Sequence, residues 1–144
     1  MKECQLSLLK YEVDKMEFDL NPHYRRDPEQ KITIEPKLGV KILEAENEKE
    51  IKRVTVSCFI FEDAQKNNFP FSCSAQVSGT FRVNNISDEK KAEHLLVYNA
   101  TAVILPYLRS VISNLTCLAE VQPVRIPIIN VYDLLKEEQT QDPA

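Results

Sequence analysis

The sequence predicts an α+β fold in which a four-stranded antiparallel sheet precedes a long apolar helix and a short C-terminal helix. The first half alternates apolar and polar residues with a period of two, which is typical of strands. The stretch 95–118 is apolar apart from scattered polar residues and carries Arg109 as its sole formal charge. We expect one domain over residues 1–136 and a frayed, charged tail over residues 137–144.

The first two predicted strands differ in the clarity of their patterns. Residues 6–20 mix apolar and charged side chains in loose alternation, which indicates a half-exposed strand. In the second segment, 32–42, the apolar residues occupy even positions and so share one face of the predicted strand: Ile32, Ile34, Leu38, Val40 and Ile42. Pro36 falls on that parity and cannot donate to a strand ladder, so it predicts an edge or a bulge.

Two further strands are predicted over residues 51–61 and 71–83. In the first of them Val54, Val56, Cys58 and Ile60 share one face, while Phe59 and Phe61 lie on the other, so both faces are expected to be covered there. The polar residues 63–68 predict a turn. Gly79 predicts a bulge or a close-packing point in the last strand. Four successive strands predict an antiparallel meander or a close relative of one.

The long helix is expected to begin after Ser87 as N-cap and to run to about Leu118, with a break or kink near Pro106. A membrane span is the rival interpretation, but its internal polar residues and the lack of flanking positive charges argue against it. Because apolar residues occupy more than one side, one sheet cannot cover them all, and a second copy of the helix is the simplest cover. The expected interface residues are Val103, Tyr107, Leu108, Val111, Ile112 and Leu115.

Residues 119–129 are too apolar for a free loop, and Pro123 and Pro127 exclude a helix there. This connector is expected to lie against the rest of the protein. A short closing helix follows, with Asn130 as its N-cap.

The sequence contains no pattern of catalytic or metal-ligating residues, so we predict a binding protein without cofactor or metal and not an enzyme. The two histidines, His23 and His94, have no ligand-like spacing, and two glycines, Gly39 and Gly79, cannot form a phosphate loop. Net charge is −4, which disfavours nucleic acid. No apolar signal run precedes the first strand, so we expect a cytoplasmic protein. Cys58 and Cys73 could face each other across a hairpin, but reduced thiols are expected in that compartment.

Two segments resemble the protein-export chaperone family SecB. Residues 99–116 read NATAVILPYLRSVISNLT and are similar to the family's main-helix signature, an apolar run into Pro-Tyr-x-Arg. Residues 123–135 read PVRIPIINVYDLL and are similar to its Pro-x-Leu-x-Pro-x-Asn-Phe-x-x-Leu stretch. A weaker match includes Gly79, Thr80 and Phe81.

The resemblance implies dimers that pair into a homotetramer and an ATP-independent holdase that binds unfolded or preprotein chains in apolar grooves. The groove residues it implies here are Ile34, Leu38, Val40, Val121, Val124, Ile126 and Ile128. Each of these residues has an equally plausible alternative role as ordinary core under a loop.

Export members of the family also present acidic residues to the translocase motor ATPase. Two of those positions hold Lys15 and Ser74 here, and Asp19 alone matches. Three functions therefore stay open: an export chaperone, a SecB-like chaperone dedicated to the antitoxin of a toxin–antitoxin pair, and a scaffold or ligand-binding protein on the same fold.

Overall fold

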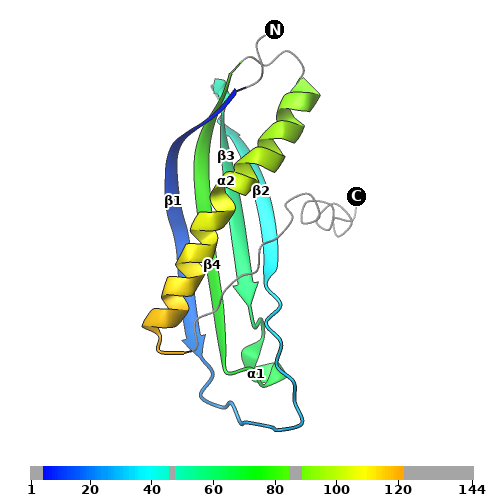
Figure 1. The fold of residues 1–144 in the computed structure, drawn as a ribbon, viewed down its shortest axis with the longest axis vertical. Coiled ribbons are helices and arrows are strands. Elements are labelled where there is room, and N and C mark those ends of the chain that lie inside the picture. Colours follow the sequence, from blue (N-terminus) through cyan, green and yellow to red (C-terminus); the bar gives the residue numbers. More distant parts are fainter. Residues whose placement is uncertain (1–4, 46–47, 85–88, 122–144) are drawn as a thin grey trace.

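The computed structural model describes residues 5–45, 48–84 and 89–121. The elements are β1 (Gln5–Leu20), β2 (Lys37–Ala45), β3 (Glu48–Ile60), α1 (Ala64–Asn67), β4 (Phe71–Asn84) and α2 (Glu89–Leu118). Figure 1 shows two layers, a long twisted sheet and the helix α2 lying diagonally across one face of it. The α+β prediction is confirmed, while the predicted connector beyond Val121 and the predicted C-terminal helix lie outside the described residues.

The strand order is β1-β4-β3-β2, and all neighbours are antiparallel. β1 lies beside β4 and not beside β2, so a simple meander is wrong for the first strand. Three hairpin-connected strands with a fourth returning beside them form a Greek key. The connection 21–36 therefore joins strands at the two opposite edges of the sheet (Figure 1).

The second strand is shorter than its apolar parity predicted, because β2 begins only at Lys37. Pro36 ends the extended pairing in front of it, since a proline has no N–H to donate to β3. Ile32 and Ile34 consequently lie in the connection 21–36 and not in the sheet. Ile32 is half-buried and packs against the core, whereas Ile34 is 43% exposed.

Two asparagines tie the connection 21–36 to the turn that holds α1. The buried Asn21 donates through Nδ2 to the carbonyls of Ala64 at 3.2 Å and Phe69 at 2.9 Å. Asn68 donates to the carbonyl of Arg25 at 2.8 Å and accepts the Arg25 N–H at 3.0 Å. Asn68 has a positive φ of 53°, which asparagine tolerates better than most residues.

Phe61 departs from the strand alternation in which its parity placed it on the outer face. It follows the end of β3 with a φ of 57°, and this left-handed residue turns the ring into the core. The ring centroid lies 4.7 Å from that of Phe69 and 5.1 Å from that of Phe71. The expectation that both faces are covered is therefore wrong, and Phe59 stays 41% exposed on the outer face.

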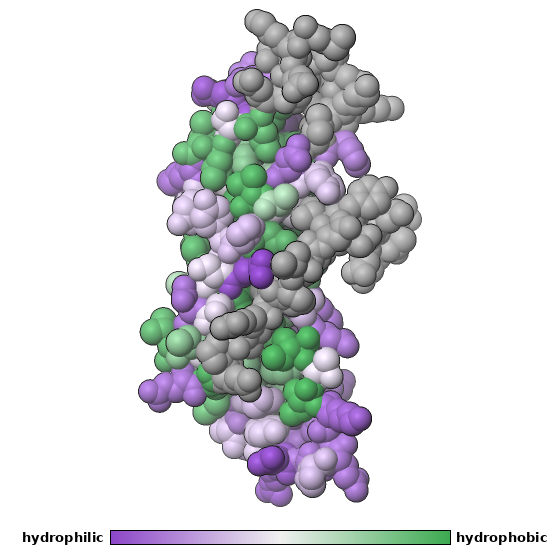
Figure 2. Space-filling model, viewed as in Figure 1, coloured by the Kyte–Doolittle hydropathy of each residue, from purple (hydrophilic) through white to green (hydrophobic). Residues whose placement is uncertain are grey.

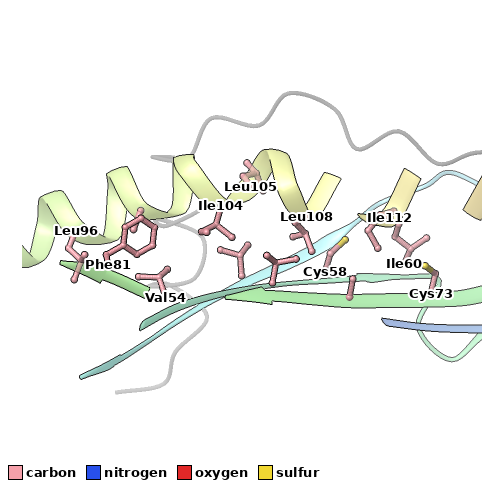
Figure 3. Close-up of a cluster of buried hydrophobic side chains, with 14 of the residues drawn as sticks. Val54, Cys58, Ile60, Cys73, Phe81, Leu96, Ile104, Leu105, Leu108 and Ile112 are labelled. Carbon is pink, nitrogen blue, oxygen red and sulfur yellow. The ribbon is translucent and has the colours of Figure 1, made fainter. Parts of the chain in front are cut away.

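The core lies between α2 and the inner, helix-facing side of β3 and β4 (Figure 3). Fully buried members include Val54, Val56, Val77, Phe81, Leu96, Ile104, Leu108 and Ile112. Gly79 is the predicted close-packing point, because a Cβ there would lie 2.5 Å from Ile104 Cδ1. The register shifts of the sheet's first strand fall elsewhere, beside Leu9 and Asp14.

The helix α2 continues through Pro106 without the predicted break. Proline removes one hydrogen bond, that from its own nitrogen to the Ala102 carbonyl. Both Pro106 and Ala102 lie on the exposed side of α2. The buried face therefore keeps its contacts with the sheet. The predicted N-cap Ser87 lies outside the described residues.

Candidate functional site

Three of the predicted client-binding residues, Ile34, Leu38 and Val40, lie on β2 or in the connection before it, whereas Val121 follows the end of α2 on the β1 side of the sheet (Figure 1). Leu38 and Val40 lie on the inner face of this edge strand, with Ile42 as the next residue on that face. All three are half-buried and pack against the edge of the core, and Ile34 precedes them in the connection. Val121 is half-buried against the same core. Val124, Ile126 and Ile128 lie outside the described residues.

The position of α2 explains why this row is only half-covered. The helix packs chiefly on β4, β3 and β1, so the inner side of β2 lies largely beyond it. In the view of Figure 2, apolar side chains appear on the helix-bearing face as separate patches between hydrophilic ones. The row on β2 is thus an apolar strip of half-buried side chains at a sheet edge.

The six predicted interface residues do not share one face of α2. Leu108 and Ile112 have no exposed surface and contact their own sheet, so assigning them to a contact between copies is wrong (Figure 3). Val111 and Leu115 are half-buried beside them. Val103 and Tyr107 are the two large apolar side chains of this set that face outward, 40% and 37% exposed.

The structure adds an apolar surface on β1 that the sequence pattern had hidden. Tyr11, Val13, Met16 and Leu20 lie on the inner side of β1 and are 40–65% exposed. The Tyr11 ring stacks on Tyr107 of α2 with centroids 4.4 Å apart. Residues 11 and 13 share a face with 16 and 20 only because Asp14 is an extra, bulged residue. The change of parity at residue 14 was the signal that identifies this face.

Asp19, which alone matches the acidic positions of export members, lies on the outer face of the sheet beside a cavity of about 170 Å³. Glu17, Glu62, Asp63 and Phe59 also line this cavity. Lys37 pairs with Glu62 at 2.8 Å and Lys15 with Glu17 at 3.5 Å. The buried Ser74 donates to Glu17 at 3.5 Å.

A charged and hydroxyl network continues along the same outer face. Arg53 Nη2 contacts Asp14 Oδ1 at 2.6 Å, and Ser78 donates to the other oxygen of that carboxylate. Thr55 Oγ1 lies 2.7 Å from the buried Ser78 Oγ. The bulge at Asp14 thus directs a carboxylate onto β3 and β4, and the network serves to join three strands.

The chemistry of an enzyme is not evident in the part of the chain that the structure describes. Within residues 5–45, 48–84 and 89–121, no three histidine, cysteine or carboxylate side chains are placed to hold a metal ion. Cys58, Cys73 and Cys117 are free thiols. Cys73 pairs with Ile60 and Cys58 with Ala75, so the two buried cysteines are diagonal neighbours and do not face each other directly.

One helical segment, Leu96–Leu118, is long and apolar enough to cross a membrane by length and composition alone. This is weak evidence, because the core helix of a globular protein passes the same test. Here Leu96, Ile104, Leu108 and Ile112 of that segment are fully buried against the sheet.

Comparison with known structures gives the same fold in two proteins of low sequence identity. A SecB-like chaperone of Mycobacterium tuberculosis, in complex with a ChAD peptide from the HigA1 antitoxin, superposes with a TM-score of 0.65 at 14% identity. That match covers 86% of this chain and 90% of the other. A protein of unknown function from Streptococcus agalactiae superposes with a TM-score of 0.51 at 11% identity, over 88% of this chain and all of that one.

Sequence comparison identifies the family. An uncharacterized protein of Methanocaldococcus jannaschii is 28% identical over an alignment of 145 positions, which covers 96% of this chain and 92% of the relative. The protein-export protein SecB of Acidithiobacillus ferrooxidans is 31% identical over 91 residues, 63% of this chain and 60% of the relative. The model of the SecB family, which is described as preprotein translocase subunit SecB, matches residues 14–142 of this chain. The chain therefore belongs to the SecB family.

Proposed function

We propose that this protein is an ATP-independent holdase chaperone that binds unfolded or preprotein chains on the apolar strip of β2. The observation that carries the proposal is the row Leu38, Val40 and Ile42 at a sheet edge that α2 leaves largely uncovered, with Ile34 exposed in front of it. Val124, Ile126 and Ile128 belong to the same proposed surface through the family resemblance. The protein would act in the cytoplasm.

The strip offers an unfolded chain two kinds of contact. Apolar client side chains lose water against Leu38, Val40 and Ile34, which is worth about 1.5–3 kcal/mol for each large side chain fully buried. Unpaired client backbone can add to β2 away from Val40, which already has a partner, as extended peptides do on other sheet edges. Neither contact depends on one sequence, so unrelated clients would bind.

The affinity of one strip is expected to be modest, because an unfolded client loses conformational entropy when it is ordered. Several strips in one oligomer raise the overall affinity by raising the effective concentration of the next binding site. Because each strip binds modestly, release of the client would require no nucleotide. The sequence supports this view, since its two glycines, Gly39 and Gly79, cannot supply a phosphate-binding loop.

A second copy of the chain is proposed to cover β1 and the adjoining side of α2. A 16-residue edge strand with exposed Tyr11, Val13 and Met16 would otherwise promote aggregation. Antiparallel pairing of β1 with the β1 of a second copy would join two sheets and bury Tyr107 and Val103 near the contact. A homotetramer would then be a dimer of such dimers.

A narrower function is favoured by one comparison. The M. tuberculosis chaperone of the same fold holds a peptide from an antitoxin, so the strip of this protein could be dedicated to one antitoxin. A dedicated chaperone would bind one segment tightly and leave unrelated unfolded proteins free. A scaffold without chaperone activity would bind neither.

Docking of the translocase motor ATPase is proposed at Asp19. The cavity beside it joins Asp19 with Glu17, Glu62 and Asp63, which would attract a lysine or arginine of a partner. Asp19→Asn should weaken capture of the purified motor ATPase while leaving client binding intact. Equal capture by both proteins would exclude this site.

Light scattering of a slowly aggregating, chemically unfolded protein tests the holdase function, with the molar mass of the chaperone measured in parallel. We expect suppression of aggregation without ATP, and weaker suppression by Ile34→Ser. Leu43→Ser is the matched control, since Leu43 is similarly exposed, at 48%, on the opposite face of β2. A chain that suppresses nothing and binds no antitoxin peptide would contradict the proposal.

A further inference from the structure

We propose that Lys37 links the acidic cavity on the outer face of the sheet to the start of the client-binding strip on β2. In the free protein Lys37 holds Glu62, one of the carboxylates that line the cavity. A cationic side chain of a docked partner would take over Glu62 and leave the first residues of β2 without this anchor. The inference concerns the regulation of the two surfaces proposed above and rests on both of them.

The cavity suits one cationic side chain. Its volume of about 170 Å³ is below the roughly 300–1,000 Å³ of common small-molecule pockets. Carboxylates of Glu17, Asp19, Glu62 and Asp63 line it, and the Phe59 ring beside them is 41% exposed. A lysine or arginine gains from carboxylate partners and from an accessible aromatic ring, so both features favour a cation.

Two lysines of the chain already compete for these carboxylates. Lys37 Nζ lies 2.8 Å from Glu62 Oε2, and Lys15 Nζ lies 3.5 Å from Glu17 Oε1. The two aspartates of the cavity form no ion pair within the described residues. An incoming cation therefore meets two open carboxylates and two that it must share with the protein's own lysines.

The pair between Lys37 and Glu62 can be exchanged for an external cation. The hydrogen bond and the charge of Glu62 raise the pKa of Lys37 above its ordinary value, with a smaller contribution from Asp63. Lys37 is therefore charged at neutral pH. Its side chain is 74% exposed and that of Glu62 is 52% exposed, and an ion pair in water contributes little enough for another cation to replace it.

Lys37 is also the first residue of β2 and directly precedes Leu38 of the strip. Across the ladder it pairs with Phe59, which lines the cavity. The preceding residues 31–36, which include Ile34, form no hydrogen bond within the described part of the chain. The contact with Glu62 is therefore a polar anchor at the point where the strip begins.

Loss of this anchor weakens the strip. The end of an edge strand frays more readily, so a client must order Ile34 and Leu38 when it binds. A partner docked in the cavity would therefore weaken client binding, and a bound client would weaken docking by the same factor. One exposed ion pair sets the size of this coupling, about two- to fivefold in affinity.

The test measures two affinities of the full chain by fluorescence anisotropy at low salt. Tetralysine with a neutral dye probes the cavity, and a reduced, alkylated protein that stays unfolded probes the strip. K37Q should bind tetralysine about two- to fivefold more tightly and the unfolded protein about two- to fivefold more weakly. Saturating unlabelled tetralysine should weaken client binding by that factor in the wild type and not in K37Q.

Two further variants separate this link from a general effect of charge. K41Q removes the same charge from the same face of β2, where Lys41 is exposed and forms no ion pair within the described residues. It should leave client binding and its response to tetralysine as in the wild type. K15Q frees Glu17 on β1, so it should tighten tetralysine binding while client binding stays unchanged.

The failures of the link and of the proposed functions differ. If both probes bind the wild type but tetralysine leaves client binding unchanged, or if K37Q behaves like K41Q, the link is wrong. Tetralysine that binds neither the wild type nor K37Q would overturn the cavity as a site for cations. A wild type that binds no unfolded protein would overturn the holdase function and the link with it.

Discussion

Gly79 lies directly beneath Ile104, so close that a Cβ added to the glycine would be 2.5 Å from Ile104 Cδ1. The same Cβ would be 2.7 Å from Cε2 of Phe81. Ile104 and Phe81 are both buried with at most 1% exposure, so neither can move into solvent. The absence of a side chain at residue 79 therefore sets how closely α2 approaches β4.

Gly79→Ala should destabilise the protein by about 1–3 kcal/mol, the usual cost of overpacking a filled core. Adding Ile104→Val removes the Cδ1 atom that makes the shortest contact. The double variant should then recover part of the loss, so that the two substitutions are not additive. Urea unfolding of the four proteins at one fixed concentration measures this cycle. If the effects of the two substitutions simply add, the Cβ added at residue 79 does not press against Ile104 Cδ1.

Leu108→Ala should cost about 2–5 kcal/mol, because this side chain is fully buried between α2 and the sheet and its removal leaves a cavity. Leu43→Ala makes the same change at a side chain that is 48% exposed and should cost less than about 0.5 kcal/mol. The measurement is the free energy of unfolding of each variant. Similar values for the two would contradict the assignment of Leu108 to the core.

The contrast between Leu108 and Val103 shows what sequence could and could not predict. The long helix and the strand faces of β3 and β4 were predictable, because their buried residues follow simple periods. The side of α2 that meets the sheet was not predictable. Apolar residues occupy more than one side of this helix, and composition alone does not show which side is buried. Leu108 and Ile112 were therefore assigned outward although they face inward.

The strand order and the β1 surface were out of reach for a different reason. Placing β1 beside β4 depends on pairs such as Leu20 with Phe71 and Gln5 with Asn84, which lie 51 and 79 residues apart in the chain. The apolar face of β1 was hidden because the bulge at Asp14 shifts its parity. Local periodicity does not record long-range contacts, and it records a bulge only as a change of parity such as the one at residue 14.

Asn21→Ala should destabilise the protein by about 1–3 kcal/mol, because two carbonyl groups lose a buried amide donor. These hydrogen bonds anchor the start of the connection 21–36. Its amide hydrogens should therefore also exchange faster in the variant, including those around Ile34. Asn114→Ala is the control, since Asn114 is exposed and makes one long contact of 3.4 Å with Ser110. Unfolding and hydrogen exchange measure the two effects. Unchanged exchange over residues 21–36 would show that Asn21 does not hold this segment.

The two buried cysteines should make the fold sensitive to alkaline pH. Burial raises the pKa of Cys58 to about 12, with a smaller contribution from the nearby Cys73 thiolate, and burial raises the pKa of Cys73 to about 11. The ordinary thiol pKa is near 9. A raised pKa means that the folded protein keeps protons which the unfolded chain releases, so this contribution is complete below pH about 9 and is lost as the pH rises toward 11–12.

Urea unfolding at pH 7, 9 and 10 should therefore show a decline in stability that is smaller in Cys58→Ala than in the wild type, after normalisation to each protein's value at pH 7. At pH 8 the native protein should label at the exposed Cys117 while Cys58 and Cys73 stay unmodified, as read by mass spectrometry of peptides. Labelling of Cys58 at the rate of Cys117 would show that the core between α2 and β3 opens readily. The same result would weaken the view that α2 stays fixed on the sheet while clients bind at β2.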